Sequence, residues 1–176
     1  MSKQQIQHQH DMKRITVHKV VINVGVGRSG EPIDKAKNAL FELTNQQPAV
    51  RGAKKTVRDF GIHKGEPIGV VVTLRRAPAI EFLKRVIAAK RNVLKASSFD
   101  NYGNISLGIH EHIDIPGTKY NPEIGIFGMD VNIVLNRPGY RIATKSRRNA
   151  KIGKTHRINK EEAIEFFKQE YGVEVE

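Results

Sequence analysis

The segment ITVHKVVINVGVGRSGEPIDKAKNALFEL, residues 15–43, contains the strand, the turn and the helix from which the fold is predicted. Residues 15–24 are rich in β-branched side chains that partly alternate with polar ones, which is typical of a strand. Three glycines between positions 25 and 30 end that pattern, and Pro32 suits the first turn of a helix. The apolar residues that follow recur at helical spacing, so we expect a helix that ends near residues 45–48.

Further along the chain, the same patterns predict four more strands and two more helices. The strands are expected at residues 49–57, 68–74, 105–115 and 124–135, and the helices at about residues 78–94 and 161–171. Consecutive strands joined by short turns favour antiparallel pairing, with the helices on one face of the sheet. The fold class is therefore α+β. We expect a polar tail at residues 1–12 and a single domain at residues 13–176, in which the other sheet face is free to meet a partner.

The composition favours an acidic polymer as the partner. The 176 residues include 30 Lys and Arg but only 18 Asp and Glu, so the formal net charge is +12. A surface that basic is typical of nucleic-acid-binding proteins. The absence of Cys excludes disulfides, thiolate metal sites and a Cys nucleophile. No stretch approaches the roughly 18 apolar residues of a membrane-spanning helix, and the N-terminal residues lack a signal peptide's apolar run, so no membrane partner is expected.

Two basic segments are predicted to be projecting loops that bind phosphates. The first, the 51–65 loop, carries Arg51, Lys54, Lys55, Arg58, His63 and Lys64. The second, the 137–160 arm, has nine basic residues and no acidic one: Arg137, Arg141, Lys145, Arg147, Arg148, Lys151, Lys154, Arg157 and Lys160. We expect the arm to gain order only against RNA or a neighbouring protein, because its like charges repel. Aromatic residues make up only 6% of the chain, which favours structured RNA over base stacking as the main binding mode.

A glycine motif leaves a second function open. The residues GVGRSG at 25–30 match the dinucleotide-binding pattern and lie between a predicted strand and a predicted helix. No acidic residue lies near position 50 to bind a ribose, however, and the next elements are two successive strands instead of another strand–helix–strand unit. We therefore favour a tight glycine-rich turn. A small nucleotide-binding enzyme stays the alternative.

The sequence offers little for catalysis or metal binding. His110 and His112 would share one face of a strand while Glu111 points the other way, so two imidazoles lack a third ligand. We expect a surface pair of histidines and no metal site. The chain has no hydrolase, zinc-protease or P-loop motif, so we expect neither enzyme activity nor a cofactor.

Several motifs in one order resemble the ribosomal protein L-five family, the large-subunit proteins that bind 5S rRNA. They are KVVINVGVG at residues 19–27, residues 54–64 with FGI, the EPIG and VTLR of residues 66–75, and FDNYGN at residues 99–104. The resemblance covers about residues 13–172. Residues 109–113 and 137–160 are similar to the archaeal and eukaryotic branch, and the chain lacks the long N-terminal helical lead of the bacterial one.

The resemblance implies a curved antiparallel sheet backed by helices, in the central protuberance of the large subunit of a cytoplasmic ribosome. It implies that Asn23, Gln46, Thr73 and Arg75 contact 5S rRNA, although Asn23 and Thr73 can also serve only to satisfy local backbone groups. The 51–65 loop would reach P-site tRNA, and the sheet end near residues 105–125 would face a small-subunit head protein at an intersubunit bridge. Further partners would be large-subunit rRNA and neighbouring central-protuberance proteins. A free-standing RNA chaperone is the third alternative.

Overall fold

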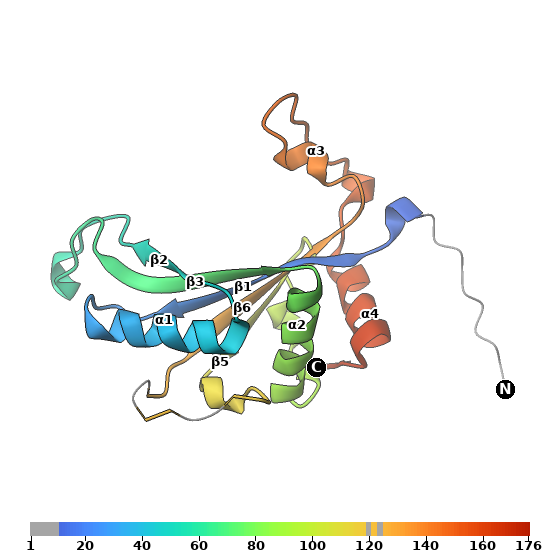
Figure 1. The fold of residues 1–176 in the computed structure, drawn as a ribbon. Helices are drawn as coiled ribbons and strands as arrows, with labels where there is room; N and C mark the ends of the chain where they lie inside the picture. The colour runs from blue at the N-terminus through green and yellow to red at the C-terminus, as the bar shows by residue number, and fades with distance from the viewer. Residues whose placement is uncertain (1–10, 119–120, 123–124) are drawn as a thin grey trace.

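The computed structural model describes residues 11–118, 121–122 and 125–176, and its centre is a five-stranded sheet (Figure 1). The strands lie in the order β2-β3-β1-β6-β5, and every neighbouring pair is antiparallel. The central strand is β1 (Thr16–Gly25), flanked by β3 (Pro67–Arg75) and β6 (Met129–Asn136), with β2 (Ala49–Gly52) and β5 (Ile105–Ile109) at the edges. The predicted α+β class with an antiparallel sheet is confirmed.

Alternation along β1 gives the sheet two different faces. Val20, Ile22 and Val24 are at most 1% exposed, whereas Lys19 and Asn23 on the opposite face are partly exposed. The flanking strands pair with β1 in a register that places their buried side chains on the same face, with the exception of Val71, which pairs with Asn23. Because a shift by one residue would exchange the two faces, this alternation fixes the register of the whole sheet.

Helices cover only the apolar face. Both α1 (Glu31–Thr44) and α2 (Ala77–Ala89) lie on the same side of the sheet, below it in Figure 1. Their buried residues join those of the strands in one core cluster. The third long helix, α4 (Lys160–Tyr171), adds Phe167, whose ring meets Phe99 edge-on with the two ring centroids 6.0 Å apart. The opposite face of the sheet is left without a helix (Figure 1).

The remaining elements are short. One helical turn, α3 (Arg141–Thr144), lies in the basic arm, and β4 (Val93–Leu94) pairs in parallel with β7 (Glu174–Val175). In the described part of the chain, 3-10 turns occupy Asp11–Lys13, Arg58–Phe60, Ala96–Ser98, His112–Asp114 and Lys154–His156. The predicted tail lies almost entirely outside the described residues, so its separation from a single domain at residues 13–176 stays a prediction.

The second strand is shorter than predicted. It was expected over residues 49–57 but ends at Gly52, with a register shift between Arg51 and Gly52. From Ala53 the chain leaves the sheet, and its amide donates to the Glu66 carbonyl at 2.8 Å. All four residues of β2 are exposed. Residues 53–57, expected in the strand, therefore belong to the basic loop.

Three other boundaries differ from the prediction. The helix expected to reach residue 94 ends at Ala89, because Arg91 and Asn92 adopt positive φ angles of 55° and 60°, and Leu94 lies in β4 instead. The strand expected to reach residue 115 ends at Ile109. The last strand starts at Met129, and residue 124, where it was expected to start, lies outside the described residues.

The predicted surface pair of histidines is wrong. His110 is exposed, but His112 is only 4% exposed and begins a 3-10 turn instead of continuing the strand. Its ring stacks on Phe127 with the centroids 4.2 Å apart, and its Nδ1 has no hydrogen-bond partner among the described residues. Within the same ranges, no three His, Cys, Asp or Glu residues could together hold a metal ion. No helix in that part of the chain is long and apolar enough to span a membrane.

Burial of His112 predicts a loss of stability in acid. Burial lowers its pKa below 6.5, although Glu111 and Glu42 act in the opposite direction. The unfolded state therefore binds the proton first as the pH falls through about 6.5, and the free energy of unfolding decreases. The variant His112→Phe keeps an aromatic ring against Phe127. We expect its free energy of unfolding, measured by urea denaturation, to fall less between about pH 7.5 and pH 5.5 than that of the wild type.

The exposed neighbour supplies the control for this experiment. His110→Gln should leave the pH dependence of the wild type unchanged, because its side chain lies in solvent. If His112→Phe lost as much stability in acid as the wild type does, burial of His112 would not be the cause.

Candidate nucleic-acid interface

The uncovered face of the sheet carries small polar and basic side chains from adjacent strands. Lys19 pairs with Arg75 and Val21 with Thr73, so both β3 residues lie on the same face as Asn23. Thr73 and Arg75 are exposed, and Asn23 is half-buried. Three of the four residues predicted to contact 5S rRNA are thus brought together on one face. These groups can donate and accept hydrogen bonds with phosphates and 2′-hydroxyls.

The same face continues onto the other two strands. Asn132 of β6 pairs with Val21, and Ser106 of β5 pairs with Asn132. The Ser106 hydroxyl donates to Asn132 Oδ1 at 2.8 Å. The fourth predicted contact, Gln46, lies outside the strands, half-buried in the turn between α1 and β2. The sequence analysis did not identify Asn132 and Ser106 as candidate site residues. Only the pairing of the strands places them on the same face as Thr73.

One end of the uncovered face carries a small basic cluster. The Arg75 Nη1 atom lies 3.2 Å from His18 Nε2, and the amide nitrogen of Asn136 lies 3.4 Å from His18 Nδ1. Partial burial, together with the charges of Arg75 and Lys19, lowers the pKa of His18. His18 is therefore neutral near pH 7 and can hold the Arg75 guanidinium in a defined orientation. The fixed charge at this end of the face comes from Arg75 and Lys19.

The 51–65 loop is ordered by hydrogen bonds within the loop. Val57 and Ile62 form an antiparallel bridge, closed by Gly61 with a φ of 64°. Glu66 closes the neck, because its carboxylate accepts hydrogen bonds from the His63 amide at 2.9 Å and the Ser29 hydroxyl at 2.8 Å. These bonds lower the pKa of Glu66. All six predicted basic residues of this segment are exposed, with Arg51 at the end of β2 and the others on the loop: Arg51, Lys54, Lys55, Arg58, His63 and Lys64.

The glycine motif at residues 25–30 forms the tight turn that the sequence favoured. The amides of Val26 and Gly27 both donate to the Ile68 carbonyl, at 3.0 and 2.9 Å, and Gly27 has a φ of 76°. Those two amides are occupied by the protein itself. With Ser29 bonded to Glu66, the turn supports the neck of the basic loop.

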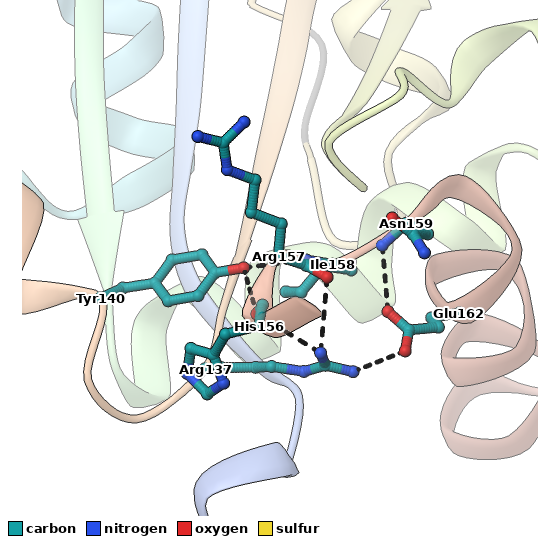
Figure 2. A network of polar contacts seen from close by, with 7 residues as sticks. All are labelled: Arg137, Tyr140, His156, Arg157, Ile158, Asn159 and Glu162. Carbon is teal, nitrogen blue, oxygen red and sulfur yellow. Dashed lines mark hydrogen bonds and ion pairs between the residues drawn. The ribbon is translucent and has the colours of Figure 1, made fainter. Parts of the chain in front are cut away.

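A buried arginine fixes the base of the 137–160 arm (Figure 2). Arg137 is 6% exposed, and its Nη2 lies 2.9 Å from Glu162 Oε1 on α4. Its Nη1 donates to the carbonyls of His156 and Arg157, at 3.4 and 3.5 Å. Burial by itself would raise the pKa of Glu162, but hydrogen bonds from the Asn159 amide and Arg137 lower it. Arg137 thus differs from the other predicted arm residues, because its charge is neutralised within the protein.

Tyr140 makes the second set of bonds at this base. Its hydroxyl donates to the His156 carbonyl at 3.2 Å and accepts from the Ile158 amide at 2.9 Å (Figure 2). Beyond this point, residues 141–151 are all exposed. The six cations Arg141, Lys145, Arg147, Arg148, Lys151 and Lys154 are exposed and Arg157 is half-buried. The arm is thus a fixed base with a basic, solvent-exposed tip.

The two basic projections lie at different ends of the uncovered face. The 51–65 loop extends from the β2–β3 end, and the arm rises from the other end on the side away from α1 and α2 (Figure 1). In a protein of net charge +12, this arrangement offers cations for phosphate contacts at both ends of the face and hydrogen-bonding groups between them.

Comparison with known proteins gives matches over nearly the whole chain. Residues 10–63 match the family model of ribosomal protein L5, and residues 67–166 match the model for the C-terminus of the same ribosomal family. The large ribosomal subunit protein uL5 of Sulfolobus acidocaldarius is 52% identical over 175 residues, which covers 99% of this chain and 98% of that protein. The uL5 protein of Nitrosopumilus maritimus is 50% identical over 164 residues, covering 93% of this chain and 95% of its own.

The base of the arm should loosen when the Arg137–Glu162 pair is broken. Glu162→Gln leaves the buried guanidinium without its ionised partner, so we expect a loss of roughly 1–3 kcal/mol in the free energy of unfolding. The Ile158 amide should also exchange faster with solvent, because its acceptor Tyr140 lies in the same network. Urea denaturation and NMR hydrogen exchange would measure the two effects.

Glu165 on the same helix provides the matched control. Its carboxylate accepts a hydrogen bond from the exposed Gln169 side chain, so Glu165→Gln should change neither measurement. Wild-type stability and exchange in Glu162→Gln would mean that the ion pair does not hold the arm.

Proposed function

The chain belongs to the ribosomal protein L5 family, and from this premise we propose that its uncovered sheet face binds 5S rRNA and helps to attach it in the central protuberance. Its matched relatives are named as large-subunit ribosomal proteins. The protein is therefore a structural constituent of the large ribosomal subunit, works in the ribosome with rRNA as a partner, and is not an enzyme. Membership of this family excludes the alternative function, that of a nucleotide-binding enzyme.

One observation carries the proposal for 5S rRNA: Asn23, Thr73 and Arg75 share the only sheet face that the helices leave open, among the described residues. Structured RNA is recognised mainly through phosphates, 2′-hydroxyls and shape, for which amide, hydroxyl and guanidinium groups are suited. Gln46 would contact the same RNA from the side, where the turn before β2 meets the sheet edge.

The two projections extend the proposal to other partners. The 51–65 loop, with Arg51, Lys54, Lys55, Arg58, His63 and Lys64 in solvent, would reach P-site tRNA. The arm would bind large-subunit rRNA or a neighbouring central-protuberance protein through its exposed cations. The sheet end near residues 105–125 would face a small-subunit head protein at the intersubunit bridge. A folded loop with a closed neck supports the tRNA contact, because a rigid projection loses little entropy on binding.

The affinity for 5S rRNA should depend steeply on salt. Each phosphate neutralised by a Lys or Arg releases counterions, so log K should fall linearly with log salt between about 50 and 200 mM. Arg75→Gln should lower that slope by about one, whereas Thr73→Ala should weaken binding by roughly 1–3 kcal/mol without changing the slope. Filter binding with purified 5S rRNA measures both quantities.

Lys35 lies on the helix-covered side of the molecule and supplies the control. It pairs with Glu31 at 2.8 Å on α1, so Lys35→Gln should leave affinity and slope unchanged. An affinity that did not change with salt would rule out phosphate contact as the main source of binding. Melting curves for Thr73→Ala separate loss of binding from loss of folding.

The 51–65 loop should serve tRNA and not 5S rRNA. Replacing Lys54, Lys55 and Arg58 with Gln should leave 5S affinity within about threefold, because the loop is distant from the centre of the sheet face, yet loosen P-site tRNA on reassembled ribosomes. The matched control removes the same charge from the arm, at Arg141, Lys145 and Arg147, and should leave tRNA retention unchanged. A large loss of 5S affinity in the loop variant would contradict this division.

A further inference from the structure

We propose that the groove at the base of the 137–160 arm binds one unstacked nucleobase of the RNA, with Tyr102 as the stacking platform. The inference rests on the proposed function, since it adds a subsite beside the RNA-binding face. The groove lies between the turn at Asp100–Asn104, strand β6 and the arm. Its volume is about 470 Å³, within the range of roughly 300–1,000 Å³ for sites that hold small molecules.

The groove is mainly apolar but also has polar groups in its lining. Val134 and Ile152 contribute apolar surface, while Asn104, Lys151 and Arg157 contribute an amide and two cations. A base has two apolar π-faces and a polar edge, so this mixture suits it. Figure 2 shows the Arg157 guanidinium extending away from the bonded network at the arm base, while its Nε donates to the Ile152 carbonyl at 3.2 Å.

Tyr102 is unusual because it is highly exposed yet rigidly presented. The residue is 63% exposed. The Asp100 carboxylate accepts from the Tyr102 amide at 2.8 Å and from the Asn104 amide at 2.7 Å, and its second oxygen accepts from the Asn104 side chain at 2.8 Å. An aromatic ring on a fixed turn loses little conformational entropy on binding, which favours a preorganised contact.

The turn is also locked against the rest of the protein. Gly103 has a φ of +78°, and a Cβ at this position would lie 2.5 Å from Ile158 Cγ2. Ile158 is 1% exposed and donates its amide to the Tyr140 hydroxyl. Both walls of the groove, the turn and the base of the arm, therefore meet at one buried residue. These contacts fix the groove along these two walls.

Charge and position favour RNA over a protein segment as the occupant. Residues 137–160 contain nine cations and no carboxylate, so the arm attracts a polyanion. Val134 pairs with Lys19, which places it on the uncovered sheet face, so the groove is continuous with the proposed RNA surface. Aromatic residues are too few for stacking to be the main mode of binding, but a single exposed ring beside the arm is suited to one flipped base.

The test compares Tyr102 variants of the full-length protein in binding to purified 5S rRNA. Tyr102→Ala should bind about tenfold more weakly, as expected for loss of one stacked base, and Tyr102→Phe should bind as the wild type does. Tyr102→Leu should resemble Ala, because it is apolar but has no π-face. The salt slope should be the same in all three, since no charge changes. Ultraviolet crosslinking of the wild type should attach a nucleotide to the peptide that contains Tyr102.

Phe41, which is 51% exposed on α1, gives the matched control, and Phe41→Ala should bind normally. Circular dichroism melting excludes unfolding as the cause of weaker binding. Salt-dependent binding by the wild type supports the proposed function whatever the Tyr102 result. Normal affinity of Tyr102→Ala for 5S rRNA would overturn the subsite, even if that variant failed to enter large subunits, because the groove would then bind another component of the subunit.

Discussion

The pairing of β1 on both of its edges is the constraint on which the rest of the structure depends. Because β1 lies between β3 and β6, its alternation decides which side of three strands meets the helices. Val20 and Ile22 are buried in the core, and the residues of β1 that alternate with them lie on the uncovered face. Core and proposed RNA surface are thus specified by the same ten residues, and a change of register would destroy both.

Acidic side chains are scarce in this protein, and three of them organise its projecting parts. Glu66 closes the neck of the 51–65 loop, Asp100 shapes the turn that presents Tyr102, and Glu162 holds Arg137 at the base of the arm. Each carboxylate accepts a hydrogen bond from at least one backbone amide. In this way it satisfies an amide that strand or helix hydrogen bonds leave without a partner. The protein can therefore direct basic segments toward solvent without leaving their bases unstructured.

The sequence predicted the strands around residues 15–24 and 68–74, the first helix and the antiparallel sheet, because these follow from periodicity and from Pro and Gly positions. It failed where tertiary contacts decide. The buried position of His112 depends on stacking with Phe127, far along the chain. The anchoring of Arg137 depends on Glu162, although the spacing of Asn159 and Glu162 matches a capping box and was a usable signal. Asn132 and Ser106 needed the strand order.

The edge strand β2 has a consequence for the protein before it meets RNA. An exposed strand edge is a template for pairing with a second chain, and such pairing leads to aggregation. β2 is only four residues long, carries Arg51, and shifts register at Gly52, so it offers few consecutive backbone groups for a neighbouring strand. The features that end β2 at Gly52 therefore also disfavour edge-to-edge pairing between copies of a protein whose proposed RNA surface is an open sheet face.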